Sequence, residues 1–197
     1  MSRPKIMPGQ QVFLGQLQKE DLPEIYKHIN GVEIATLSGG FAAPVSLESQ
    51  TQWYEQNHKN PARVDFGIFL NETEQLMGTV SLKSINHHQQ TAGLGIVIFR
   101  QEHLGKGHGT EASRLMVEYG MFHLNLYNID LLVLSNNVRA IRAYEKAGFQ
   151  TLGKRTGCFV LGGQRLDGTW MDIVRDEVDL SHLRTRYFGT RAQRGTP

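Results

Sequence analysis

The chain has 197 residues, with 21 lysines and arginines against 19 aspartates and glutamates and a hydrophobic fraction of 40%. This length and composition fit one folded domain, and a net charge of +2 provides no broad positive field for nucleic acid. With the single cysteine Cys158 no internal disulfide can form, and no apolar run has the length of a signal-peptide core or a membrane span. We therefore expect a cytoplasmic protein that binds neither nucleic acid nor membrane.

The sequence divides into an arm, a domain and a tail. Residues 1–10 are expected to be a flexible N-terminal arm, and residues 11–180 are expected to form one domain. Residues 181–197 contain four arginines and little apolar pattern after Phe188, which is typical of a solvated basic tail.

Apolar runs bounded by turn residues predict seven strands inside the domain. They lie at residues 12–17, 65–70, 76–85, 94–99, 129–134, 149–160 and 165–178. Capping residues and helical spacing predict four helices, which begin after Asp21, Ser46, Gly109 and Asn137. Residues 30–45, with several glycines, are expected to be a loop or a broken helix.

Three glycines in five residues lie between the strand at residues 94–99 and the helix that follows it. The loop reads Leu104-Gly105-Lys106-Gly107-His108-Gly109-Thr110. Glycine permits positive φ, so several N–H groups can converge at a helix N-terminus, whose dipole favours negative charge. The loop therefore predicts a phosphate-binding site.

Two common phosphate-binding motifs match this loop poorly. A Walker A motif needs Lys-Ser/Thr directly after its last glycine, where this chain has Thr110-Glu111. A Rossmann fingerprint needs glycine or alanine in place of Thr110, although Asp130 stands at about the distance that this fingerprint requires. A Rossmann-type nucleotide-binding module therefore stays an alternative.

The segment after the next strand resembles a known family. It reads Asn137-Val138-Arg139-Ala140-Ile141-Arg142-Ala143-Tyr144-Glu145-Lys146-Ala147-Gly148-Phe149. Together with the glycine loop it resembles the GCN5-related N-acetyltransferases (GNAT), which combine a (Gln/Arg)-x-x-Gly-x-(Gly/Ala) loop with an Asn-x-x-Ala-x-x-x-Tyr-x-x-x-Gly-Phe helix. The resemblance runs from about Gly78 to Glu177 and is greatest to the spermidine and ribosomal-protein N-acetyltransferases. Leu104 departs from the pattern where the family has Gln or Arg, which implies weaker anchoring there.

The resemblance implies an α/β (α+β) domain of GNAT fold, with a mixed, mostly antiparallel twisted sheet of about seven strands flanked by helices. It implies an N-acetyltransferase that moves an acetyl group from acetyl-CoA to a primary amine of a small molecule or a protein N-terminus. Family members often pair through sheet edges, so a homodimer is a further expected assembly. No metal is expected, because His87 and His88 have no further ligands at metal-binding spacing.

The resemblance also implies a role for each residue of the site. The cofactor-binding residues would be Val97, Ile98, Phe99, Leu104, Gly105, Lys106, Gly107, His108, Gly109, Thr110 and Asn137. The loop would surround the pyrophosphate, the strand edge would meet the pantetheine arm and thioester, and the backbone N–H of Ile98 would donate to the oxyanion. Asn137 would contact the pantetheine arm, although it also suits a helix cap. Tyr144 would be the general acid, with an ordinary core position as its alternative.

The general base and the acceptor are left open by the sequence. Residues 91–99 carry no acidic side chain, although many relatives have a glutamate there. The candidates for the base are Glu33, Glu102, His103, Asp172 and a water relay. Residues 34–44 contain no carboxylates, which counts against a polyamine acceptor. The missing glutamate and Leu104 leave a CoA-binding sensor or scaffold with weak turnover as an alternative function.

Overall fold

The computed structural model describes residues 3–31, 34 and 44–189. The strands are β1 (Met7–Pro8), β2 (Val12–Gln16), β3 (Val64–Leu70), β4 (Leu76–Asn86), β5 (Thr91–Ile98), β6 (Asn128–Leu134), β7 (Gln150–Leu161) and β8 (Gln164–Val174). The helices are α1 (Leu22–Ile29), α3 (Leu47–His58), α4 (His108–His123), α5 (Val138–Ala147) and α6 (Ser181–Phe188), with short 3-10 helices η1 (Lys19–Asp21), η2 (Gln101–His103) and η3 (Arg175–Glu177).

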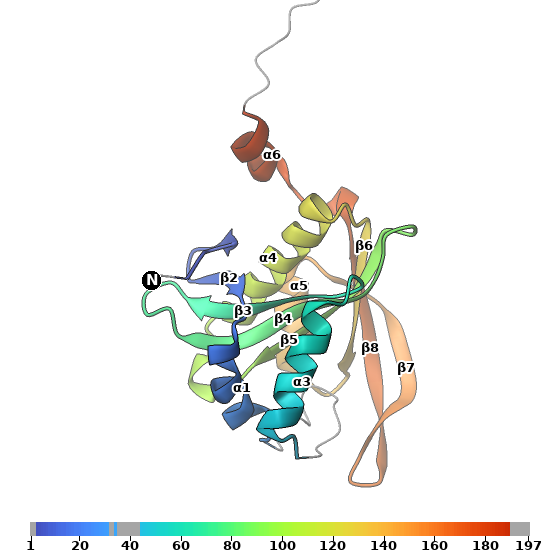
Figure 1. The fold of residues 1–197 in the computed structure, drawn as a ribbon. Coiled ribbons are helices and arrows are strands. Elements are labelled where there is room, and N and C mark those ends of the chain that lie inside the picture. The colour runs from blue at the N-terminus through green and yellow to red at the C-terminus, as the bar shows by residue number, and fades with distance from the viewer. Residues whose placement is uncertain (1–2, 32–33, 35–43, 190–197) are drawn as a thin grey trace, which may run out of the picture.

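The strands form one twisted sheet in the order β1-β2-β3-β4-β5-β6-β8-β7 (Figure 1). Of the strand pairs in the described chain, only β5 and β6 run parallel. The predicted fold class, a mixed and mostly antiparallel sheet flanked by helices, is therefore confirmed, with eight strands in place of about seven. The Rossmann-type alternative is wrong, because that fold has a mostly parallel sheet.

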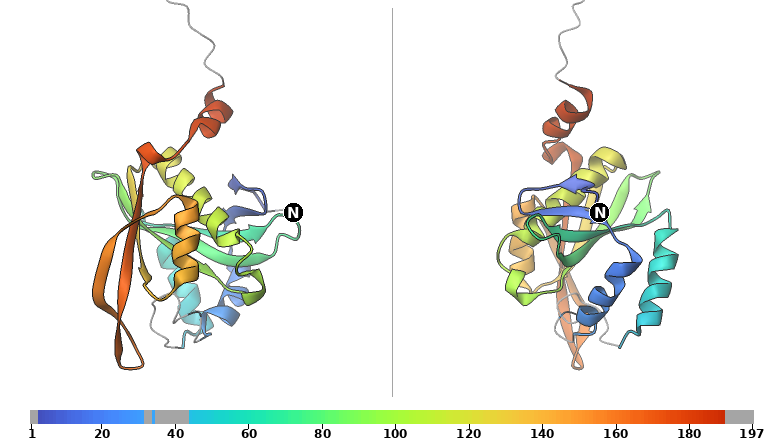
Figure 2. Two further views of the ribbon diagram at one scale, coloured as in Figure 1. Left: turned by 180° about the vertical axis from the view of Figure 1, so that it is seen from behind. Right: turned by 60° about the vertical axis from the view of Figure 1, so that its left-hand side comes forward.

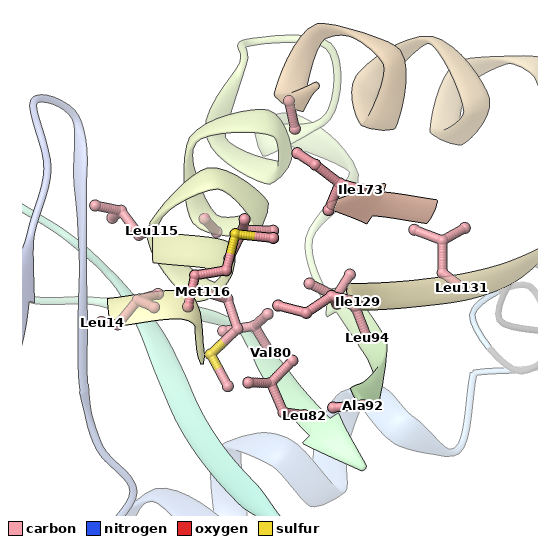
Figure 3. Packing of buried hydrophobic residues seen from close by; sticks show 14 of the residues in the cluster. Leu14, Val80, Leu82, Ala92, Leu94, Leu115, Met116, Ile129, Leu131 and Ile173 are labelled. Carbon is pink, nitrogen blue, oxygen red and sulfur yellow. The ribbon is translucent and has the colours of Figure 1, made fainter. Parts of the chain in front are cut away.

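Helices cover both faces of the sheet (Figures 1 and 2). On one face α4 and α5 enclose the larger core, in which Met116 of α4 lies against side chains of the central strands such as Val80 and Ile129 (Figure 3). On the other face α1 and α3 cover a smaller core of Phe13, Phe69 and Phe99 with their neighbours. None of the helices in the described ranges is both long and apolar enough to cross a bilayer.

Two segments differ from the sequence predictions at the ends of the domain. The arm expected to be flexible is tied to the sheet over its described part, because Met7 pairs with Leu14 and is almost fully buried. The described part of the basic tail contains α6, whose Leu183 is buried and whose Tyr187 stacks on Phe122 of α4. Both segments are held by apolar contacts to residues far away in the sequence, which a local pattern does not reveal.

The feature of the sheet that positions the site is the separation of β5 from β6. Their parallel pairing covers only three positions, from Thr91↔Asn128 to Gly93↔Asp130. Beyond Gly93, β5 continues to Ile98 and β6 continues to Leu134 without pairing to each other. The two strands therefore leave an opening, and the backbone of β5 has a free edge on that side.

Candidate active site

The glycine loop bends into the N-terminus of α4. Gly105 and Gly107 have φ values of +75° and +89°, a region that side chains with a Cβ rarely adopt. A Cβ on either glycine would meet nothing within 4 Å, so these positions need glycine for their backbone angle and not for lack of space. Gly107 is the N-cap of α4 and no described side chain caps the helix there, which leaves N–H groups of the first turn available to an anion.

Cationic side chains line the cavity that contains this helix end. Arg114 of α4 and Arg139, Arg142 and Lys146 of α5 line the same cavity as the loop. The side chains of Arg114 and Thr110 also donate to backbone carbonyls of α5, Lys146 O at 3.1 Å and Ala143 O at 3.3 Å. Guanidinium groups around a helix N-terminus suit a phosphorylated ligand, because charge attraction adds to the backbone N–H groups.

The free edge of β5 presents the backbone of Ile98 to the opening. The N–H of Phe99 donates to Met77 O of β4 at 2.8 Å, and Ile98 lies opposite Gly78. Because bonded and non-bonded positions alternate in an antiparallel pair, Val97 and Phe99 direct their N–H groups to β4 and Ile98 directs its own away from it. Of the three strand residues expected to offer backbone groups, only Ile98 therefore points its amide toward β6.

Tyr144 lies on α5 beside this opening. Its ring packs edge-on against Phe149, with 5.9 Å between ring centroids, and it contacts the larger core while also lining the cavity. Burial raises the pKa of the Tyr144 phenol to about 12. The hydroxyl therefore keeps its proton throughout the neutral range and can only donate there.

Asn137 is the N-cap of α5. Its side-chain oxygen accepts from the N–H of Ala140 at 3.2 Å, which is the capping geometry expected as the structural alternative. Asn137 also lines the cavity, so its position is compatible with contact to a bound pantetheine arm.

One cavity of about 1830 Å³ brings most of the predicted site residues together. The ones that line it are Val97, Ile98, Phe99, Leu104, Gly105, Gly107, Gly109, Thr110, Asn137 and Tyr144. Lys106 and His108 do not line it. The His108 side chain is buried under the loop, where its Nδ1 makes no hydrogen bond to the described residues and burial lowers the pKa of its imidazole.

The cavity continues between β4 and the helices α1 and α3, on the face away from α4. Arg63 holds Asp65 with two hydrogen bonds of 2.7 Å and lies over the Trp53 ring, 5.2 Å from its centroid. Lys83 lines the same region, and a Cβ added to Gly95 would stand 2.8 Å from its Nζ, so Gly95 leaves room for the ammonium group. Burial and the charge of Arg63 lower the pKa of Lys83.

The predicted candidates for the base lie in different places. Glu33 lies outside the described residues. Glu102 is exposed and pairs with Arg100 at 3.6 Å. Asp172 of β8 accepts a hydrogen bond from Asn128 at 2.6 Å. Neither Glu102 nor Asp172 lines the cavity. His103 does line it, close to His108.

Sequence reasoning missed several residues that line the cavity. The spacing of Arg139, Arg142 and Lys146 places them on one stripe of α5, a signal that was available in the sequence. His28, Arg63 and Lys83 carried no such signal, because they come from α1, the position before β3, and β4, and meet only in the folded chain. This part of the cavity is therefore visible only in the structure.

Comparisons with known proteins give the family of the chain. The acetyltransferase (GNAT) domain family matches residues 11–150. A probable N-acetyltransferase YjcK of Bacillus subtilis (strain 168) is 35% identical over 158 residues, which cover 80% of each chain. The spermidine N(1)-acetyltransferase of Escherichia coli (strain K12) is 36% identical over 105 residues, which cover 53% of this chain and 56% of that relative.

A solved structure is similar over nearly its whole length. The spermidine N-acetyltransferase from Vibrio cholerae, in complex with CoA and spermine, superimposes with a TM-score of 0.79 at 26% identity. The match covers 86% of this chain and 98% of that one. Together with the matched family domain, this likeness means that the chain belongs to the GNAT family and is an acetyl-CoA-dependent N-acetyltransferase.

Proposed function

We propose that the protein acetylates a primary amine of a small molecule or a protein N-terminus by direct attack of the amine on acetyl-CoA, with Tyr144 as the general acid. The observation that carries the proposal is that one cavity holds the uncapped N-terminus of α4, the free amide of Ile98 and the Tyr144 ring. These are the groups that a diphosphate, a thioester carbonyl and a leaving sulfur each require.

In the proposed complex the pyrophosphate lies at the loop from Leu104 to Thr110, and the pantetheine arm runs along the free edge of β5 past Asn137. The thioester oxygen then accepts from the N–H of Ile98. Attack by the amine places negative charge on that oxygen, and a fixed backbone donor stabilises the charge without reorganising. Collapse of the intermediate breaks the C–S bond, and the Tyr144 phenol donates to the departing sulfur.

On the acceptor side of the cavity, the residues that the structure describes favour an acceptor with one reacting amine. Three acidic residues line the cavity, and each already has partners: Asp65 pairs with Arg63, Glu111 accepts from backbone N–H groups of residues 10–12, and Glu118 contacts His182 at 3.3 Å. Lys83 adds a positive charge there. A polyamine has two or more ammonium groups, which this part of the wall would repel.

A polyamine is the second candidate acceptor. It is favoured by the relatives, because the similar proteins from E. coli and V. cholerae are named spermidine acetyltransferases and the latter was solved with spermine. Residues 35–43, whose lack of carboxylates counted against a polyamine in the sequence, lie outside the described chain.

An assay of free-thiol release from acetyl-CoA with a panel of amines tests the proposal. The panel contains a peptide with a free N-terminus, the same peptide with a blocked one, an amino sugar, and spermidine. We expect amine-dependent release above hydrolysis, faster with the free peptide or the amino sugar than with spermidine. Faster turnover of spermidine would select the second candidate, and no turnover with any amine would favour the sensor or scaffold over this proposal.

A further inference from the structure

Helix α1 places a histidine next to the end of β5. The His28 ring stacks on Phe99 with 5.7 Å between centroids and 6° between planes, and Phe99 directly follows Ile98. His28, Phe99 and Ile98 all line the cavity. The imidazole therefore lies on the α1 side of the strand end whose amide is directed into the opening.

A carboxylate holds this imidazole. His28 Nε2 lies 3.1 Å from Glu24 Oε1, one helical turn away, and Glu24 also accepts from Lys27 Nζ at 3.1 Å and from the Arg100 guanidinium. Burial raises the pKa of Glu24, but the hydrogen bonds from His28, Lys27 and Arg100 outweigh it and lower that pKa to about 2. Glu24 is therefore ionised at neutral pH.

The ionised carboxylate fixes the tautomer of the neutral ring. Because a carboxylate only accepts, the nitrogen that faces it carries the proton, and Nδ1 of neutral His28 then has a lone pair. Among the described residues, the only hydrogen bond of this ring is the one between Nε2 and Glu24. Neutral His28 therefore has one unoccupied basic nitrogen, on a ring held in place by Glu24 and Phe99.

We propose that His28 is the general base that takes the proton of the attacking amine, with Glu24 as the residue that positions it. This inference rests on the proposed acetyl transfer. The ammonium form of the acceptor gives one proton to His28, and the neutral nitrogen then forms a bond to the thioester carbon. The C–S bond breaks, the sulfur receives the proton of Tyr144, and the second proton of the nitrogen passes through water to the phenolate. The imidazolium releases its proton to solvent, so atoms and charge balance over the cycle.

The charged groups around His28 are consistent with this role. Lys27 on α1 and Arg100 after β5 both pair with Glu24, and Arg100 also contacts Glu102, so carboxylates offset these two charges. From the other walls of the cavity, Lys83 and the Arg63–Asp65 pair face the acceptor space. His103 is the other histidine near the loop, but its ring lies 5.7 Å from His108 and has no carboxylate partner within the described chain.

Replacement of the imidazole followed by chemical rescue tests the role. His28→Ala should lower kcat at pH 7 by about 100-fold, the low end of the usual range for a general base, and should leave the Kd of acetyl-CoA unchanged. The deficit should shrink as the pH rises through the pKa of the acceptor amine, about 8 for a peptide N-terminus and about 10.4 for an alkyl amine, because the neutral amine no longer needs a base before it attacks. Added imidazole should restore part of the rate with saturation, because it can occupy the space left by the ring.

Two variants make the result decisive. His28→Gln keeps a polar side chain of similar reach and should show the same pH-dependent deficit, which separates the loss of the base from a loss of folding. His88→Ala removes an exposed histidine in the turn after β4 and should have no effect on kcat at any pH. Wild-type turnover in the same assay tests the proposed acetyl transfer separately.

Wild-type turnover with an unchanged rate for His28→Ala would overturn the inference and leave the proposed function intact. An equal loss at every pH without imidazole rescue would also overturn it, because a merely structural role has that signature. Absence of turnover in the wild-type protein would instead count against the proposed function itself.

Discussion

The two halves of the cavity are built in different ways. The half assigned to the cofactor consists mainly of backbone: the loop at Gly105 and Gly107, the N-terminus of α4 and the free edge of β5. The half assigned to the acceptor consists of side chains from segments far apart in the chain, such as His28 of α1 and Lys83 of β4. The first half is continuous in sequence from β5 to α5, whereas the second is assembled only on folding.

This difference explains what each half tolerates. A backbone site depends on φ, ψ and strand separation, so Leu104 can replace the Gln or Arg of the family pattern without removing the N–H groups proposed to bind phosphate. A side-chain site depends on each residue, so related proteins can change acceptor by a few substitutions while the cofactor site stays the same. The predictions below test this division.

The largest expected effect is that of Tyr144→Phe, because Tyr144 is the proposed general acid and its side chain lies at the boundary between the halves. Loss of the hydroxyl should lower kcat by at least about 100-fold and leave the Kd of acetyl-CoA within about twofold. Steady-state kinetics and calorimetric titration measure the two quantities. Tyr187→Phe, on the exposed ring of α6, is the matched control and should change neither. A large loss of cofactor affinity in Tyr144→Phe would mean that the ring serves binding and not proton donation.

A backbone change should act on the cofactor half alone. Gly107→Ala forces a Cβ into a left-handed conformation at a cost of about 1–2 kcal/mol. If the loop changes conformation to relieve this backbone strain, acetyl-CoA binding should weaken by about tenfold, with little change in the KM of the amine. Gly163→Ala in the β7–β8 turn is the matched control, since Gly163 also has positive φ (+78°) and open space around it. Equal cofactor affinity in both variants would contradict a backbone-built phosphate site.

A charge change should act on the acceptor half alone. Lys83→Met removes a cation from the acceptor wall and should lower the KM of spermidine by about three- to fivefold, as expected for one partly screened charge. The KM of acetyl-CoA should stay constant. Lys59→Met, at the exposed C-terminal end of α3, should leave both constants unchanged. A change confined to the KM of acetyl-CoA would place Lys83 in the cofactor half.

The smallest expected effect is on stability and concerns the Glu24 contacts. The pKa of Glu24 is lowered from its ordinary 4.5 to about 2, so the folded protein gains stability above pH 4.5 that it loses as the pH falls toward 2. The gain is about 1 kcal/mol, since a quarter of the side chain is exposed and solvent screens it. Urea unfolding should show Glu24→Gln less stable than wild type at pH 7, with the difference reduced at pH 3. A difference that does not change with pH would contradict this account, and Glu72→Gln in an exposed turn is the control.

Sequence patterns revealed much of the cofactor half, because its signals are local. The glycine loop, the cap at Asn137 and the apolar stripe that carries Tyr144 all lie within short windows, and each has a matching feature in the structure. Strand pairing joins segments that are distant in the sequence, so short sequence windows do not predict it. The strand at Met7 and the end of the β5–β6 pairing are therefore seen only in the fold. The spacing of Glu24 and His28 on α1 is local, but their contacts with Phe99 and Arg100 come from 71 and 76 residues away, so the sequence did not reveal that the pair lies at the cavity.

The most direct test of the division is an amide-resolved titration with acetyl-CoA, observed by 1H–15N NMR. The backbone amides of Ile98, Gly107 and Gly109 should shift on binding, while the amide of Phe99, already bonded to Met77, should keep its hydrogen-exchange protection. The amide of Gly163 in the distant turn should not respond. Unchanged amides at Ile98 and the loop, with saturable shifts elsewhere, would contradict a cofactor site built from the backbone of β5 and α4.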